Sequence, residues 1–284
     1  MSQGHPTPFL DLSKRISAIS RFEQVLTYFE NNNDDINIGY YDKVKLVKFT
    51  YEYACNQSSR DLIVLVALCR MGIIDSDDYH VNLDDACLRD TLKAGLYRFA
   101  NNLLQNFFLP LKALAGEKAR PSSPRVLDNH SGSRKCMNRA LLNMIHHGLL
   151  KTITDGDIEG PKNALTLRTS LRDAFKRFRI FFDPVEDKED TYVIKAFPPG
   201  IPGLPVTRNL SSFNGGNDDL PDPRLLAAHR DIGHILYLSA TRPLVGGEAQ
   251  ADEFTEGNSP GLKHEGTDMF GHTWVKLRPV RVKI

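Results

Sequence analysis

The sequence predicts an α+β fold, in which an N-terminal helical unit is followed by a small mixed domain. Up to residue 114, apolar side chains recur at three- and four-residue intervals, which is the spacing of one helix face. After residue 160, short apolar runs of strand length are separated by turn residues and by two amphipathic helices. Consecutive helices followed by mixed strands and helices are typical of the α+β class.

Composition divides the chain into four expected segments. Residues 1–114 are the helical unit, and residues 115–136 are a basic flexible linker, because this stretch has no apolar periodicity and is rich in Pro, Ser, Lys and Arg. Residues 137–240 are the mixed domain. Residues 241–284 are a polar tail that ends in a strand-like segment, because apolar residues alternate again from Gly266 onward.

The periodicity predicts four helices in the first segment: Asp11–Glu30, Tyr40–Cys55, Arg60–Met71 and Leu83–Leu114. Ser58, with Asp61 three residues on, resembles a capping box for the third helix, and Gly72 is a typical helix end. Asn82 is expected to cap the fourth helix. Three cysteines fall in these helical patterns and are expected to be small core residues: Cys55, Cys69 and Cys87.

Charge and composition argue against a secreted or membrane protein. The 284 residues carry a formal net charge of +1, so only a local patch can support binding to nucleic acid. The first residues lack the pattern of a signal peptide, and no apolar run reaches the roughly 20 residues of a membrane span. The four cysteines form no CxxC pair. We expect an intracellular protein, cytoplasmic or nuclear, with no membrane partner.

The most informative stretch reads IEGPKNALTLRTSLRDAFKRFRIFF. A turn precedes Asn163, and Ala164–Leu167 alternates well enough for a strand. Thr169 or Ser170 is expected to cap a helix whose apolar residues recur at i, i+3, i+4 and i+7. The aromatic run Ile180–Phe182 suits a second strand. Strand, helix and strand therefore follow an asparagine loop within one short segment.

Further elements are expected on either side of this segment. A helix at Asn138–Leu150 precedes it. A hairpin at Arg179–Phe197 and a short strand at Val206–Leu210 follow it. Asp222, with Pro223 at the first helical position, is a strong start for a helix that is expected to cross the hairpin and close the core.

These motifs resemble the HNH endonuclease-like proteins of filamentous fungi. The resemblance rests on NALTL, on the helix pattern LxxxF and on RFRIFF, and it continues downstream in LPVTRNL and DPRLLAAHRDIGHILYLS. Upstream it reaches LVKFTYEYA and LLQNFFLPLKAL, so it covers most of the chain. It implies a ββα element that carries a histidine on its first strand, an asparagine in the loop and a last histidine on the helix.

By this resemblance Asn163 is the family's asparagine, but Arg172 replaces the helix histidine, and the segment with the first histidine is missing. An arginine stays protonated and offers no lone pair to a metal ion, so no metal ligand is assigned. His130 and His147 are the candidates to substitute for the missing catalytic histidines. His229 and His234 lack the i, i+4 spacing of a metal pair and are expected to be structural.

Five basic residues gather on and around the central helix: Arg168, Arg172, Lys176, Arg177 and Arg179. Arg172 and Lys176 share a helix face, which suits contact with a phosphate backbone without cleavage. A plain solvated face is the alternative.

Three functions stay open, of which we favour the first: a catalytically inactive nuclease-like protein that binds DNA or another protein. The others are an active metal-dependent DNA endonuclease and an accessory protein of a fungal pathway. Only the endonuclease needs a cofactor, Mg²⁺ or Zn²⁺.

Overall fold

The computed structural model describes residues 12–32, 41–74, 79–109, 145, 161–212 and 220–241, and the backbone of 266–268, 273–274 and 280–282. These residues fall into two compact units. The first holds the N-terminal helices, Ile145 and residues 234–241, and the second holds residues 161–212, residues 220–233 and the C-terminal strands. Helices come first and a mixed arrangement follows, so the chain is α+β.

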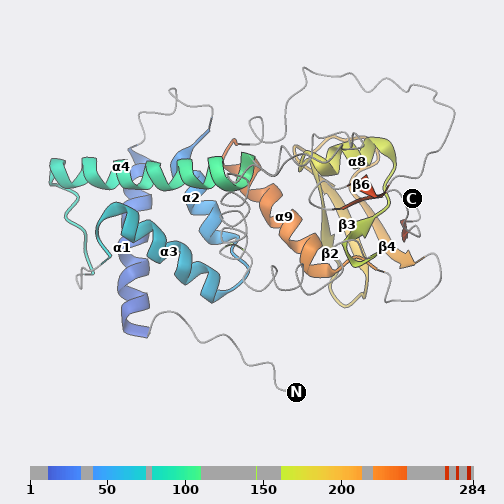
Figure 1. The fold of residues 1–284 in the computed structure, drawn as a ribbon, viewed down its shortest axis with the longest axis horizontal. Helices are drawn as coiled ribbons and strands as arrows, with labels where there is room; N and C mark the ends of the chain where they lie inside the picture. Colours follow the sequence, from blue (N-terminus) through green and yellow to red (C-terminus); the bar gives the residue numbers. More distant parts are fainter. Residues whose placement is uncertain are drawn as a thin grey trace, which may run out of the picture. The chain divides into compact units, whose positions relative to one another are not determined.

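The N-terminal unit is built from four helices, coloured from blue to green in Figure 1: α1 (Leu12–Asn31), α2 (Lys43–Glu52), α3 (Gln57–Met71) and α4 (Ala86–Leu103). A π-helical turn, Leu104–Phe108, continues α4. Phe22, Phe99 and Phe108 are among the largest fully buried side chains. The four predicted helices are present, with ends that differ from the predicted ones by up to three residues, and residues 110–114 of the fourth lie outside the described residues.

Two contacts hold α3 against its neighbours. Asp61 of α3 has no exposed surface, and each of its carboxylate oxygens accepts a hydrogen bond from Arg15 Nε of α1 at 3.0 Å. On α4, Gly95 lies so close to the end of α3 that an added Cβ would be 2.7 Å from Met71 Cα. A side chain at this glycine would therefore collide with backbone, which explains why a glycine interrupts a helix interior here.

The cap of α3 differs from the sequence prediction. Asn56, in an extended conformation, accepts a hydrogen bond from the N–H of Ser59 at 2.9 Å, so the helix begins three residues earlier than expected. The predicted capping box of Ser58 and Asp61 is therefore wrong. Both of its side chains are buried, and the carboxylate is committed to the ion pair with α1. The predicted end is confirmed, because the glycine after α3 is left-handed, with φ 76°.

Two further caps were also predicted wrongly. Asp85 caps α4 by accepting a hydrogen bond from the N–H of Cys87 at 2.9 Å, whereas Asn82 lies further upstream and bonds to Asp84 N. In the second unit, α8 (Thr169–Lys176) begins after Arg168, whose side chain makes no capping bond. Both residues that were expected to cap α8 are instead its first two helical residues, and they are exposed.

The expected core position of three cysteines is also wrong, because Cys55, Cys69 and Cys87 are exposed. On α3 the adjacent core positions are occupied by Leu68 and Met71, which are at most 1 % exposed. A cysteine between two such positions falls on the solvent side of a 3.6-residue period. Among the described helices, none is long and apolar enough to cross a membrane.

The second unit contains two antiparallel sheets. The larger has the order β2-β3-β4-β7, formed by β2 (Ile180–Pro184), β3 (Thr191–Ala196), β4 (Val206–Ser212) and β7 (Val280–Val282). The predicted hairpin is confirmed, with Ile180 opposite Ala196 and Pro184 opposite Tyr192. The smaller sheet has the order β1-β5-β6, formed by β1 (Ala164–Leu165), β5 (Gly266–Asp268) and β6 (Thr273–Trp274).

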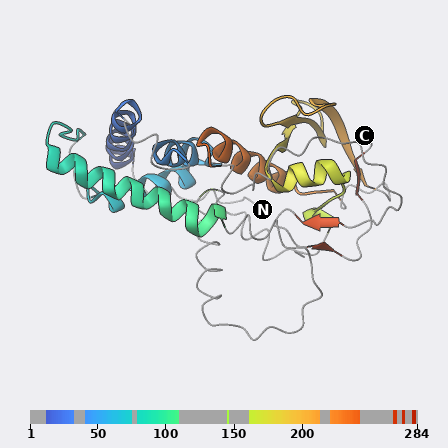
Figure 2. The same cartoon turned by 90° about the horizontal axis from the view of Figure 1, so that it is seen from above.

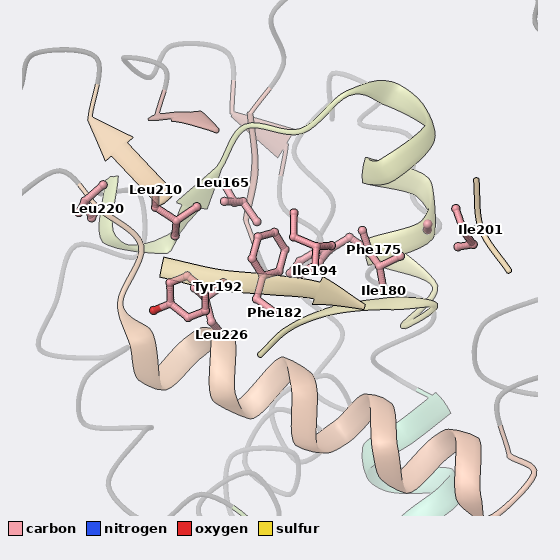
Figure 3. Packing of buried hydrophobic residues seen from close by; sticks show 11 residues of the cluster. Leu165, Phe175, Ile180, Phe182, Tyr192, Ile194, Ile201, Leu210, Leu220 and Leu226 are labelled. Carbon is pink, nitrogen blue, oxygen red and sulfur yellow. The ribbon is translucent and has the colours of Figure 1, made fainter. Parts of the chain in front are cut away.

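Two helices flank the larger sheet, α8 and α9 (Pro223–Leu238), and Figure 2 shows α8 in yellow beside the strands. The start of α9 is confirmed, because Asp222 Oδ1 accepts a hydrogen bond from the N–H of Arg224 at 2.8 Å. Eleven buried side chains form the core of this unit, and Figure 3 shows Phe175 of α8, Phe182 of β2 and Leu226 of α9 among them. Most of these residues are aromatic or branched aliphatic, and they connect α8 to the sheet.

The ββα element stays a prediction. Its second strand is present only as the two residues of β1, which pair with β5 from the C-terminal segment, Ala164 lying opposite Asp268. The strand that should come before Asn163 would precede residue 161, outside the described residues. The expected linker lies outside them as well, and so does the helix at Asn138–Leu150 except for Ile145, which is helical and fully buried.

Candidate nucleic-acid interface

The basic residues identified in the sequence lie on α8 and at its two ends. α8 has eight residues and buries Ala174 and Phe175 on the side that faces the core. A helix that is apolar on one side presents its polar residues on the other. Arg168 is exposed, and the four remaining basic side chains are half-buried: Arg172, Lys176, Arg177 and Arg179. These five residues are called the basic face below.

The basic face has few acidic residues near it in the described part of the chain. Residues 161–182 contain six basic residues and one acidic residue, Asp173, which amounts to a formal charge of +5. The ion pairs of this unit involve other residues, with Asp183, Asp222 and Asp231 as their acids. Within the part of the chain that the structure describes, no carboxylate forms an ion pair with the basic face.

The amino-terminal end of α8 adds to this positive potential. No side chain caps the end at Arg168, and the first turn has no acidic residue. The N–H groups of a first turn carry the positive end of the helix dipole. Arg172 follows one turn later and Lys176 one turn after that, so the charges are spaced about 6 Å apart along one side of the helix. A row of this kind can follow successive phosphates.

The carboxyl-terminal end of α8 has an unusual conformation. The N–H of Arg179 donates to Ala174 O at 2.8 Å, and the N–H of Phe178 donates to Phe175 O at 2.9 Å. Together these bonds form a Schellman motif, in which the residue after the cap is left-handed and usually a glycine. Here that residue is Phe178, with φ 54°. A bulky residue in this region is strained, so its surroundings must stabilise it.

His229 of α9 contacts this strained end. The side chain is 4 % exposed, and its Nε2 lies 2.9 Å from Phe175 O. A carbonyl oxygen only accepts, so Nε2 carries the proton and donates. The imidazole stacks on Phe175 with ring centroids 3.7 Å apart and on Phe178 at 4.6 Å. Burial lowers the pKa of His229 to about 4, partly opposed by the hydrogen bond to Phe175, so the ring is neutral at pH 7.

Of the candidate catalytic residues, Asn163 alone lies within the described part of the chain. Asn163 ends a 3₁₀ turn, Pro161–Asn163, directly before β1, and its side chain is 5 % exposed. The same turn is tied to the start of α9, where the N–H of Asp222 donates to Lys162 O at 2.8 Å. His130 and His147 lie outside the described residues. The structure therefore places Asn163 inside the domain and leaves both substitute histidines as predictions.

Sequence reasoning missed two residues near this interface. Lys162 is exposed and belongs to the same positively charged segment, so its charge could have been counted from the sequence. The contact of His229 with α8 could not, because it joins residues 54 positions apart. No periodicity or motif in the chain indicates which carbonyl group a distant imidazole will reach.

Other described parts of the chain offer less chemistry. A groove of about 750 Å³ runs along α1, where Ile16, Gln24 and Tyr28 are among the lining residues and Glu23 is the only carboxylate. Among the described residues, no group of three or more His, Cys, Asp or Glu side chains could hold a metal ion. The basic face is thus the feature with the most distinctive charge. No protein-family model, curated protein or solved structure matches the chain.

Proposed function

We propose that this protein binds nucleic acid through the basic face of α8 and does not cleave it. The observation that carries the proposal is the lack of any described carboxylate paired with these five side chains. A phosphate backbone supplies negative charges at intervals that a row of Arg and Lys can neutralise, with release of counterions. Binding of this kind is independent of sequence, because phosphate contacts position a protein without reading bases.

The proposal includes descent from a nuclease of the HNH type, on the strength of the sequence resemblance. In such a nuclease the helix histidine helps to hold a metal ion near the scissile phosphate. Arg172 stands at that position here, and its permanent positive charge repels a divalent cation but attracts a phosphate. The substitution therefore favours binding over cleavage at the same place on the helix.

The salt dependence of binding gives a quantitative expectation. Each phosphate neutralised on duplex DNA contributes about 0.9 to the slope of log K against log salt concentration. Contacts from all five residues of the basic face would give a slope of about −4.5. Non-specific affinities of this class are in the range of roughly 10⁻⁴ to 10⁻⁶ M at physiological salt.

The experiment is a fluorescence-anisotropy titration of a labelled duplex over a series of salt concentrations. In the test variant, Arg172 and Lys176 both become Ala, which is expected to reduce the magnitude of the slope by about 2. The matched control replaces Lys188, in the β2–β3 loop, and Lys195, on β3 of the same unit, with Ala and should leave the slope unchanged. Equal loss of binding in both variants would mean that net charge alone determines affinity and would refute the interface.

Nicking of supercoiled plasmid separates this function from the two alternatives. Purified protein is incubated with Mg²⁺ or Mn²⁺, with EDTA as a control and Asn163→Ala as a variant whose folding is checked by circular dichroism. Cleavage that needs both the metal and Asn163 would replace the proposal with an active endonuclease. Neither binding nor cleavage would leave a protein-binding or accessory role.

A further inference from the structure

The carboxyl-terminal end of α8 depends on support from outside the helix. α8 has only eight residues, and isolated helices shorter than about 12 residues are marginal in water. Arg172 and Lys176 repel each other at i, i+4, and the amino-terminal end lacks a side-chain cap. At the other end, Phe178 holds a left-handed conformation with φ 54°. Packing and hydrogen bonds from neighbouring elements must therefore keep α8 in its helical form.

One side chain of α9, His229, supports the carboxyl-terminal end of α8 most directly. His229 stacks on the rings of Phe175 and Phe178, which hold the left-handed residue against α9. Its Nε2–H also donates to Phe175 O, one of the last carbonyls of α8, which normally has no partner within a helix. The same oxygen accepts the cap bond from Phe178 N. One buried imidazole thus stabilises both the ring positions and the backbone of the cap.

We propose that His229 is a positioning residue for the basic face: its hydrogen bond to Phe175 O and its stacking fix the end of α8, so that Arg172, Lys176 and Arg179 are presented to phosphates in one arrangement. This inference rests on the proposed function. The histidine itself is buried and contacts no ligand. It acts by raising the fraction of molecules in which α8 is formed, and apparent affinity is proportional to that fraction.

Two variants separate the hydrogen bond from the aromatic contact. His229→Phe keeps a ring between the two phenylalanines but has no donor, whereas His229→Gln keeps an N–H donor at a similar distance without the ring. A matched control is His234→Gln on the same helix, because His234 and its stacking partner Tyr53 both belong to the N-terminal unit. Each variant is made in the full chain, and hydrogen exchange is followed at the amides of Phe178 and Arg179, which donate the two cap bonds.

The Phe variant is expected to exchange at these amides about five-fold faster than the wild type, which corresponds to the loss of one net hydrogen bond. Its affinity for the duplex should fall in proportion to the fraction of molecules with a formed α8, and therefore by less than about five-fold. The Gln variant should restore both values to within about two-fold, and the His234 control should leave both unchanged.

Three outcomes would overturn the inference. Wild-type exchange rates in the Phe variant would show that the hydrogen bond does not support the cap. Equally fast exchange in the Gln and Phe variants would show that an amide donor cannot replace the imidazole, so that the hydrogen bond alone does not account for the support of the cap. If the Phe variant exchanges faster but the wild-type protein does not bind the duplex, both the proposed function and the positioning role are refuted. The support of the α8 cap by His229 would still stand.

Discussion

Acidification should destabilise the second unit through His229, and the size of the effect follows from its burial. The pKa of this histidine is about 4 in the folded protein, because burial disfavours the imidazolium, whereas its ordinary value is 6.5. Between these values the unfolded chain binds more protons than the folded one, so the free energy of unfolding falls as the pH falls. The full effect is about 3 kcal/mol, since one pKa unit corresponds to 1.36 kcal/mol. Roughly 2 kcal/mol of it is lost between pH 7 and pH 5.

The assay is urea unfolding followed by far-ultraviolet circular dichroism at several pH values. Carboxylates with a lowered pKa, such as Asp222, also lose stability in acid: burial raises the pKa of Asp222, but hydrogen bonds and charge from Arg224 outweigh it. The informative quantity is therefore the difference between the wild type and His229→Gln, which has no titrating group at this position. The wild type should lose roughly 2 kcal/mol more than the variant between pH 7 and pH 5. Parallel curves for the two proteins would refute the reasoning.

Three further predictions concern packing and charge. Asp61→Ala should cost about 3 kcal/mol or more of unfolding free energy, because it leaves the Arg15 guanidinium without its buried partner; a loss below about 1 kcal/mol would contradict this. Gly95→Ala should destabilise the N-terminal unit by about 1 kcal/mol or more despite the better helix propensity of Ala, because the new Cβ meets Met71; a higher thermal midpoint would disprove the close crossing. Calorimetric titration with Mg²⁺, Mn²⁺ or Zn²⁺ should show no micromolar site, because Arg172 offers no lone pair to a metal ion. Micromolar binding would refute the view that Arg172 abolishes the metal site.

Periodicity was sufficient to predict the main helices and the β2–β3 hairpin. Phe22, Leu68 and Phe99 each lie on the apolar face of a different predicted helix and are buried as expected, because a helix buries one face whatever it packs against. The ends of the helices were harder to predict. Several neighbouring polar residues can cap a helix, and the choice between Asn56 and Ser58 depended on the commitment of Asp61 to α1.

The features of the candidate interface also fall into those that local sequence predicts and those that depend on the fold. The concentration of positive charge between residues 161 and 182 and the amphipathic character of α8 can both be predicted without the fold, because they depend on residue type and local spacing. Three findings come from the fold instead: no described acid forms an ion pair with the basic face, Asn163 is buried, and His229 reaches the end of α8. These are contacts between segments far apart in the chain, and local propensity carries no information about which distant groups will meet.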